Sequence, residues 1–314
     1  MVNPLFLMGV PKSGTTLLQR VLASHPAISS ASEPWILLPP IHALHTAGGV
    51  TEYGWPSCKN ALARVCTALP EGRIGYLKAV ATMARQIYGD LSDDSARYFL
   101  DKTPRYHLIA DDLIEAFPDA RFVFLWRNPV SLIASIILHN HDRIRGLRFG
   151  ALDLTRGLAN LARAEGVLGP RAFSVRYEDF VVRPEEELRG IMRFLELDYL
   201  PSQLSDFAGT LFSGGDRNGV ARTQIETSSL ERWKTVLASP ARRAYALRLL
   251  RSLDGDLLQR HKYDKDVLEE QVRALRARWT ASAFVEIAEL AAASVFVRLQ
   301  AQAMRIGKSD GLLY

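Results

Sequence analysis

The chain has 314 residues, of which 48% are hydrophobic and 23% charged; this balance excludes a largely disordered protein and is typical of a globular one. The formal net charge is +5, and arginine supplies most of the basic residues. Because the guanidinium group suits phosphate and sulfate and no Lys/Arg-rich run occurs, a small anionic ligand is favoured over nucleic acid.

The cysteines and the apolar segments indicate where in the cell the protein is expected. Cys58 and Cys66 have no second pair with which to form a zinc site, and a reducing environment suits them best. An apolar run begins within a few residues of the first methionine, which leaves no room for a signal peptide. No stretch approaches the roughly 20 apolar residues of a membrane span. We therefore expect a soluble, cytoplasmic protein without a membrane span or a structural metal.

The first predicted elements are a strand over residues 4–8, a glycine loop and a helix. Gly9 and Gly14 lie five residues apart, as in the G-x-x-x-x-G-K-[ST] loop, whose backbone N–H groups hold phosphates. The lysine is displaced, however, because Lys12 lies inside the loop and Thr15 occupies the position that this pattern gives to lysine. The sequence therefore predicts an anion site that needs no metal.

The second predicted strand, over residues 27–31, ends close to Glu33. Since the carboxyl ends of parallel strands meet at the edge where an open α/β sheet binds its ligand, we expect Glu33 to face the same crevice as the glycine loop. A solvated loop glutamate is the alternative interpretation. From Trp35 to Pro56, prolines and glycines without periodicity predict an irregular loop over the site.

Helices are predicted over residues 57–69, 80–91 and 107–117. A short strand over residues 98–100 lies between the second and third of these helices, and it leads into Asp101-Lys102-Thr103-Pro104. This strand end therefore carries another basic residue.

The strongest buried-strand signal covers residues 121–126 and ends at Arg127. Pro129 suits the first turn of a helix, which we expect over residues 130–138. A Mg²⁺-dependent nucleotide hydrolase would end this strand with an aspartate that binds the metal. Arg127 stands there instead and provides a second positively charged binding site for an anion. Ser135 lies eight residues further on, about two helical turns.

The remaining chain is predicted to contain one further strand and several helices. The strand covers residues 172–177, and a glycine-rich loop precedes Arg222. The predicted helices cover residues 184–195, 228–237, 240–260 and 264–304. The last of them carries an apolar stripe, which needs a partner surface. Packing against the rest of the chain is preferred over self-association through these C-terminal helices, and charges within the stripe exclude a membrane span.

These residues together resemble the sulfotransferases that use 3′-phosphoadenosine 5′-phosphosulfate (PAPS). The segment Pro11-Lys12-Ser13-Gly14-Thr15-Thr16 is similar to that family's 5′-phosphosulfate loop, and Arg127 with Ser135 is similar to its 3′-phosphate motif. Residues 176–180 and 232–233 match later landmarks, so the resemblance covers about residues 4–260. The pattern is most similar to the tyrosylprotein and heparan-type branches, and it lacks an obvious counterpart of the catalytic histidine of the cytosolic small-molecule branch.

The resemblance implies an α/β fold in which a parallel sheet is flanked by helices in three layers around a P-loop-like site. It implies a sulfotransferase domain over residues 1–263 and a helical extension over residues 264–314. PAPS would be the co-substrate, adenosine 3′,5′-bisphosphate the product, and no metal would be required. Glu33 would be the general base, Lys12 would stabilise the leaving phosphate, and Lys102 would assist. The implied nucleotide-binding residues are Pro11, Lys12, Ser13, Gly14, Thr15, Thr16, Arg127, Ser135, Tyr177 and Arg222.

The acceptor stays open at the level of sequence. Its hydroxyl can belong to a small molecule, a glycan, a lipid, a carrier-bound intermediate or a peptide tyrosine. Two other functions also stay open. A P-loop small-molecule kinase would turn over ATP with Mg²⁺, and a non-catalytic nucleotide-binding protein of the same fold would transfer no sulfate. If Glu33 is not the base, His25, His107 and His139 are the next candidates.

Overall fold

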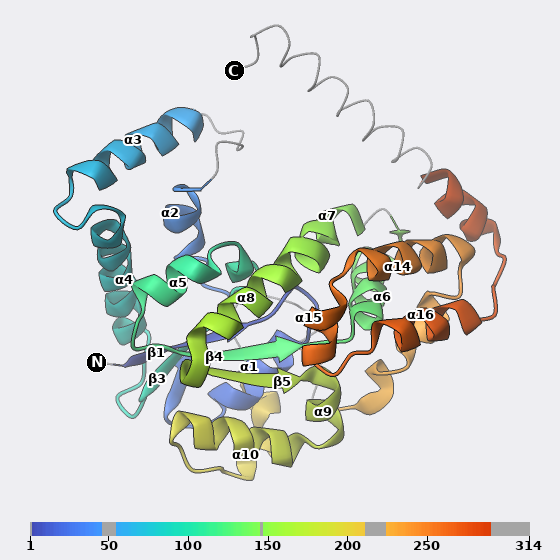
Figure 1. The fold of residues 1–314 in the computed structure, drawn as a ribbon. Coiled ribbons are helices and arrows are strands. Elements are labelled where there is room, and N and C mark those ends of the chain that lie inside the picture. The colour runs from blue at the N-terminus through green and yellow to red at the C-terminus, as the bar shows by residue number, and fades with distance from the viewer. Residues whose placement is uncertain (1, 46–54, 145–146, 211–223, 290–314) are drawn as a thin grey trace, which may run out of the picture. The chain divides into compact units, whose positions relative to one another are not determined.

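The computed structural model describes residues 2–45, 55–144, 147–210 and 224–289 (Figure 1). The chain divides into two compact units. The first unit comprises Met1–Asn128 and Asp153–Thr227, and the second comprises Pro129–Leu152 and Ser228–Tyr314. The predicted boundary between residues 263 and 264 stays a prediction. No helix among the described residues is long and apolar enough to cross a membrane.

A five-stranded parallel sheet forms the centre of the first unit, in the order β2-β3-β1-β4-β5, which confirms the predicted α/β class. The central strand β1 pairs with β3 on one side and β4 on the other. The strand order therefore reverses at β1, and the loops at the carboxyl ends of β1, β3 and β4 border one crevice. The strands are β1 (Asn3–Met8), β2 (Ile28–Ser30), β3 (Tyr98–Asp101), β4 (Arg121–Trp126) and β5 (Ala172–Arg176).

The central strands are apolar because helices cover both faces of the sheet. Figure 1 shows α5 (Ala110–Ala116) and α8 (Leu158–Leu168) on one face and α1 (Thr15–Ala23) and α10 (Pro184–Leu195) on the other. Phe6 on β1 stacks on Phe122 of β4 and meets Phe117 edge-on, with both ring centroids 5.1 Å away. Such aromatic contacts fix the pairing of β1 with β4 and hence the position of the loop that follows β1.

In the described part of the first unit, the structure has more helices than the sequence predicted, and some of the predicted helices differ in extent. Residues 35–56 were predicted to be an irregular loop, but Pro39 and Pro40 lie in the first turn of a short helix, where proline is tolerated. The helix predicted to begin at Val80 begins at Gly72. The α-helices of this unit are α1 (Thr15–Ala23), α2 (Leu38–His42), α3 (Trp55–Ala68), α4 (Gly72–Asp90), α5 (Ala110–Ala116), α8 (Leu158–Leu168), α9 (Tyr177–Val182), α10 (Pro184–Leu195) and α11 (Ser202–Ser205). Its shorter turns are η1 (Tyr106–Leu108), the π-helical η3 (Asp153–Gly157), η4 (Gly169–Arg171) and η5 (Phe207–Gly209).

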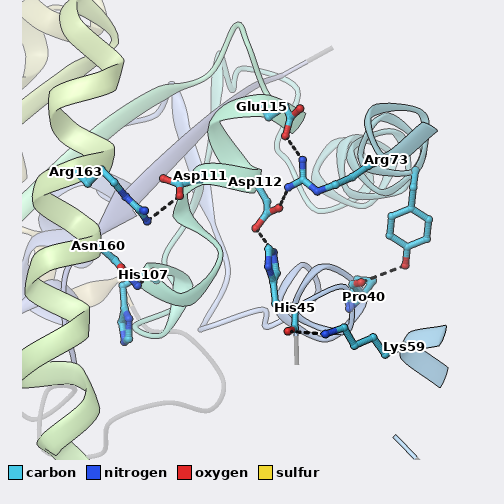
Figure 2. Close-up of polar contacts among 11 residues, drawn as sticks. Pro40, His45, Lys59, Arg73, His107, Asp111, Asp112, Glu115, Asn160 and Arg163 are labelled. Carbon is cyan, nitrogen blue, oxygen red and sulfur yellow. Dashed lines mark hydrogen bonds and ion pairs between the residues drawn. The ribbon is translucent and has the colours of Figure 1, made fainter. Parts of the chain in front are cut away.

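A buried carboxylate joins α5 to α4 and to the end of the α2 segment. Asp112, with only 2% of its side chain exposed, accepts hydrogen bonds from Arg73 and lies 2.7 Å from Nε2 of His45 (Figure 2). Arg73 also pairs with Glu115 one helical turn further along α5. Tyr76 of α4 donates to the carbonyl of Pro40 at 3.1 Å. Polar contacts therefore hold Pro40 and His45, at the end of the segment that follows Glu33, against α4 and α5.

The described part of the second unit is helical. Its elements are α6 (Pro129–His139), α7 (Leu147–Leu152), α13 (Arg232–Val236), α14 (Pro240–Ser252), α15 (Gly255–Arg260) and α16 (Lys265–Ala274), with the turn η6 (Thr227–Ser229) before α13 and further helix over residues 281–289. The prediction of a single helix over residues 240–260 is wrong, because the helix is interrupted at Leu253. Asp254 then caps α15 by accepting from the N–H groups of Asp256 and Leu257. The helix predicted over residues 264–304 is also wrong over its described part, because α16 ends at Ala274.

A buried ion pair holds residues 281–289 against α14 within this unit. The Arg242 guanidinium, 9% exposed, donates to Glu286 Oε1 at 2.7 Å and to Asp142 Oδ1 at 2.7 Å. Ser239 donates to the other oxygen of Glu286 at 2.5 Å. The loop after α6, the start of α14 and the C-terminal segment therefore share one polar network.

Candidate active site

The loop between β1 and α1 is a tight turn that depends on glycine. Gly14 has a φ of 102°, and a Cβ added there would lie 2.4 Å from the Tyr177 ring, so another residue would clash. Lys12 also adopts a positive φ of 72°. The N–H of Ser13 donates to the carbonyl of Val10 at 3.1 Å. Because Gly14 has no side chain with which to cap α1, the N–H groups of its first turn keep their capacity to bind an anion.

The end of β2 is fixed beside α1 and β3, as expected for neighbouring parallel strands. Gln19 of α1 donates from Nε2 to Ser30 Oγ at 2.9 Å and to the carbonyl of Ala31 at 2.8 Å. Ser30 in turn donates to the carbonyl of Leu100 on β3 at 2.6 Å. These bonds position the short segment that leads to Glu33.

Glu33 and Lys102 form an ion pair close to the first turn of α1. The Lys102 ammonium lies 2.6 Å from Glu33 Oε1 and 3.5 Å from Thr16 Oγ1. The lysine side chain is only 2% exposed, whereas the glutamate side chain is 22% exposed. The ion pair therefore joins a buried ammonium group to a carboxylate that is still partly exposed. The structure thus brings together three residues that the sequence assigned to three separate segments.

A buried network around Asp101 holds the segment that carries Lys102. Asp101 Oδ2 accepts from the hydroxyls of Tyr88 at 2.6 Å and Tyr106 at 2.9 Å, and Oδ1 accepts from Thr103 Oγ1 at 3.3 Å. Burial raises the pKa of Asp101 to about 6, although the three hydroxyl donors and the charge of Lys102 oppose that rise. No pattern in the sequence indicated this network. The adjacency of Asp101 to Lys102 was visible, but the tyrosine donors come from elements whose packing the sequence does not specify.

Trp35 connects this network to Glu33, and no sequence motif marks it as a site residue. The backbone N–H of Trp35 donates to Thr103 Oγ1 at 3.3 Å. Its indole N–H donates to Glu33 Oε2 at 3.3 Å. The two oxygens of Glu33 therefore have different partners, Lys102 on one and Trp35 on the other.

Arg127 and Tyr177 lie against the glycine loop from the other side of β1. Arg127, 8% exposed, donates from Nη1 to the carbonyl of Lys12 at 2.8 Å. Its guanidinium carbon lies 4.3 Å from the centroid of the buried Tyr177 ring. The backbone N–H of Asn128 donates to Glu178 Oε1 at 3.0 Å. The ends of β4 and β5 are thereby joined to the loop after β1.

Two of the predicted nucleotide-binding residues are not part of this described cluster. Ser135 lies on α6, which belongs to the second unit, and is partly exposed. Arg222 lies outside the described residues. Their predicted roles stay predictions.

The alternative histidine bases occupy other kinds of environment. His25 is buried, its Nδ1 accepts from the N–H of Ala27 at 3.0 Å, and burial lowers its pKa. His107 is also buried and pairs through Nε2 with Asp153 Oδ1 at 2.8 Å; Figure 2 shows it beside Asn160, which donates to its carbonyl. His139 is exposed at the end of α6. The first two are held as structural histidines.

The family model described as "Sulfotransferase family" matches residues 4–201, which include every strand of the sheet and most of the cluster. The chain belongs to the sulfotransferase family. That membership confirms the resemblance stated from the glycine loop and from Arg127 with Ser135.

Similar proteins support the family assignment. The nodulation protein NoeE of Sinorhizobium fredii is 32% identical over 268 residues, covering 75% of this chain and 62% of that protein. The protein-tyrosine sulfotransferase of Drosophila melanogaster is 26% identical over 233 residues, covering 72% of this chain and 43% of that protein. The chain therefore spans less than two thirds of the length of either of these sulfotransferase-family relatives.

Solved structures show the same fold. The sulfotransferase domain of the curacin biosynthetic pathway matches with a TM-score of 0.56 at 20% identity, covering 84% of this chain and 99% of that chain. The sulfotransferase domain of the Synechococcus PCC 7002 olefin synthase matches with a TM-score of 0.52 at 22% identity, covering 84% of this chain and 96% of that chain. The parallel sheet flanked by helices is therefore the sulfotransferase fold.

Proposed function

We propose that the chain transfers a sulfuryl group from PAPS to an acceptor hydroxyl, with Glu33 as general base. The observation that carries this proposal is the contact of Lys102 with both Glu33 Oε1 and Thr16 Oγ1 at the edge of the sheet. The Lys102 ammonium group thereby contacts both the proposed proton acceptor and a hydroxyl of the anion-binding turn. Charge-assisted contacts of this kind suit the transfer of an anionic group between two oxygens.

The residues present fit a nucleotide with anionic groups. The loop supplies Lys12, the hydroxyls of Thr15 and Thr16 and backbone N–H groups, all of which are donors. Pro11, Ser13 and Gly14 shape the turn, and Tyr177 packs against Gly14. We assign the 5′-phosphosulfate to this loop. We assign the 3′-phosphate to Arg127, and the roles of Ser135 and Arg222 rest on the sequence motif alone.

The chemical step needs one base and stabilised negative charge. The acceptor oxygen forms a bond to sulfur while the bond from sulfur to the bridging oxygen of PAPS breaks. The electron pair of the broken bond stays on the leaving 5′-phosphate of adenosine 3′,5′-bisphosphate, where Lys12 neutralises it. The acceptor proton moves to Glu33, and Lys102 keeps that carboxylate in place. None of these roles requires a metal.

The acceptor is proposed only as a class. The name of the Drosophila relative indicates transfer to protein tyrosine, and a phenolic hydroxyl is therefore one candidate for this chain. A screen of hydroxyl acceptors with labelled PAPS identifies a working substrate. Mg²⁺-dependent turnover of ATP in the same assay would instead support the kinase alternative, and wild-type protein that transfers sulfate to nothing would support a non-catalytic binding protein.

The first prediction tests the base. Glu33→Gln keeps the shape of the side chain and removes its proton-accepting charge, so sulfate transfer should fall about 10²- to 10⁴-fold. Affinity for adenosine 3′,5′-bisphosphate, measured by calorimetry, should stay close to that of the wild type. Glu71→Gln is the matched control, because Glu71 is an exposed carboxylate that pairs with Lys78 on α4. Near-normal transfer by Glu33→Gln would show that the base lies elsewhere.

A further inference from the structure

Trp35 adopts a backbone conformation that a bulky residue rarely takes. Its φ is 57°, in the left-handed region that favours glycine. Two hydrogen bonds hold it there, one from the backbone N–H to Thr103 Oγ1 and one from the indole N–H to Glu33 Oε2, both of 3.3 Å. Strain of this kind persists only where the surroundings fix it, and it clusters at functional sites. Both of its hydrogen-bond acceptors belong to the candidate active site.

Trp35 is also an exposed residue. It is 40% exposed, whereas Trp126 at the end of β4 is 3% exposed. Lys102, on the other oxygen of Glu33, is buried. The exposed Trp35 ring is therefore bonded to the oxygen of Glu33 that does not contact Lys102. An exposed aromatic ring beside the proposed base offers a stacking surface to a ring that carries the acceptor hydroxyl.

We propose that Trp35 determines acceptor specificity, with its indole N–H orienting Glu33 and its open face stacking on an acceptor whose hydroxyl is carried by a ring. The inference rests on the proposed role of Glu33. A phenol presents a flat aromatic face to the indole and a sugar ring presents a face of C–H groups, whereas the hydroxyl of an unbranched alkyl chain is attached to neither. The stacking contact and the indole N–H bond are separable, since a phenylalanine keeps the first and loses the second.

The test uses three hydroxyl probes, 4-methylphenol, methyl glucoside and 1-hexanol, with labelled PAPS as donor. Trp35→Asn removes the stacking face while retaining a residue that tolerates a positive φ. It should raise KM about tenfold for the ring probe that stacks, with less than about a twofold change for 1-hexanol. The ring probe whose KM rises, 4-methylphenol or methyl glucoside, shows whether the acceptor ring is a phenol or a sugar. Trp35→Phe should leave KM for that probe close to wild type and lower kcat, because only the bond to Glu33 is lost.

Controls separate this inference from the proposed function. Trp279→Asn replaces an exposed tryptophan of the second unit and should leave the ratio of KM between ring and chain probes unchanged. Affinity for adenosine 3′,5′-bisphosphate verifies that each variant is folded. Binding of the probes in the presence of this nucleotide is measured by calorimetry, independently of turnover. If Glu33→Gln stays active while Trp35→Asn still loses ring affinity selectively, the base is wrong and the stacking role stands. Equal changes for all three probes, no change for any, or no ring probe bound by the wild type would overturn it.

Discussion

At the scale of single residues, Asp101 explains how Lys102 and Glu33 come to lie together. Its carboxylate accepts three hydrogen bonds, and one donor, Thr103, accepts in turn from the backbone of Trp35. A buried carboxyl with satisfied partners rigidifies its surroundings, because breaking any bond leaves a polar group unpaired at low dielectric. The segments that carry the acid and the amine of the ion pair are therefore tied to one buried point.

A prediction about pH follows from the burial of Asp101. Its pKa is about 6 in the folded protein, against a usual value of 3.8. Between these values the folded protein keeps a proton that the unfolded chain has released, so this group makes stability fall as pH rises through the window. Asp101→Asn cannot ionise. The free energy of unfolding of the variant, relative to wild type, should therefore increase with pH by up to about 1.4 kcal/mol per pH unit inside the window.

Urea unfolding at several pH values measures this difference. The groups that face Asp101 are the hydroxyls of Tyr88, Tyr106 and Thr103 and the Lys102 ammonium, none of which ordinarily titrates in this acidic range. Asp111→Asn is the control, because Asp111 is an exposed carboxylate paired with Arg163. A difference between variant and wild type that stays constant from pH 4 to pH 6 would contradict the assigned pKa.

At the scale of elements, the end of β4 is predicted to hold the 3′-phosphate through Arg127. Arg127→Ala should weaken the binding of adenosine 3′,5′-bisphosphate far more than the binding of its 3′-dephospho analogue. The reason is that a hydrogen bond to a charged group contributes about 1.5 to 3 kcal/mol. Calorimetry with both nucleotides measures the two losses. The structure adds a complication, because Arg127 also donates to the carbonyl of Lys12 in the glycine loop.

Arg127→Lys separates the two functions of this side chain. Lysine keeps the positive charge but lacks the planar fork that bonds to the loop carbonyl while facing a phosphate. If Arg127→Lys regains affinity for the 3′-phosphorylated nucleotide and not for the 3′-dephospho analogue, the assignment is supported. Equal losses for both nucleotides in Arg127→Ala would show that Arg127 acts by shaping the loop and does not bind the 3′-phosphate.

The sequence predicted the elements that carry strong local signals. The five strands followed from short apolar or alternating runs. Several candidate residues stood at strand ends, and the resemblance to sulfotransferases implied their roles. Contacts between distant segments had no such signal, which is why the bonds of Trp35 to Thr103 and Glu33 were missed. The break before Asp254 did have a signal, because aspartate is a preferred N-cap. It was overridden by helical spacing on both sides of it.

At the scale of the whole molecule, the C-terminal segment belongs to a unit with its own buried contacts. Leu268 and Val272 of α16, 6% and 0% exposed, are buried as the apolar stripe predicted. Further along, Phe284 and Ile287 are 62% and 41% exposed, and Glu286 is buried against Arg242 in their place. The predicted stripe is therefore covered in α16 and open in residues 281–289, while its continuation lies outside the described residues.

These two halves of the stripe allow the role of the C-terminal segment to be divided experimentally. Truncation after Tyr263 removes α16 and the partner of Arg242, so it should lower the melting temperature and the solubility, or change oligomeric state or acceptor turnover, more than it lowers PAPS affinity. The physical reason is that α14 loses the covering of Leu268 and Val272, and burial of each such side chain contributes about 1.5 to 3 kcal/mol. Thermal unfolding, light scattering and calorimetry with adenosine 3′,5′-bisphosphate measure these effects separately.

A double variant, Phe284→Ser with Ile287→Ser, tests self-association without removing α16. Both side chains are exposed, so the melting temperature of a monomer should change little. If the open half of the stripe joins two copies, the mass by light scattering should fall in the double variant and in the truncated protein alike. If the stripe serves only the fold of its own unit, the truncated protein alone should be affected. A truncated protein that stays soluble, melts at the wild-type temperature, keeps the same mass and turns over normally would contradict both roles.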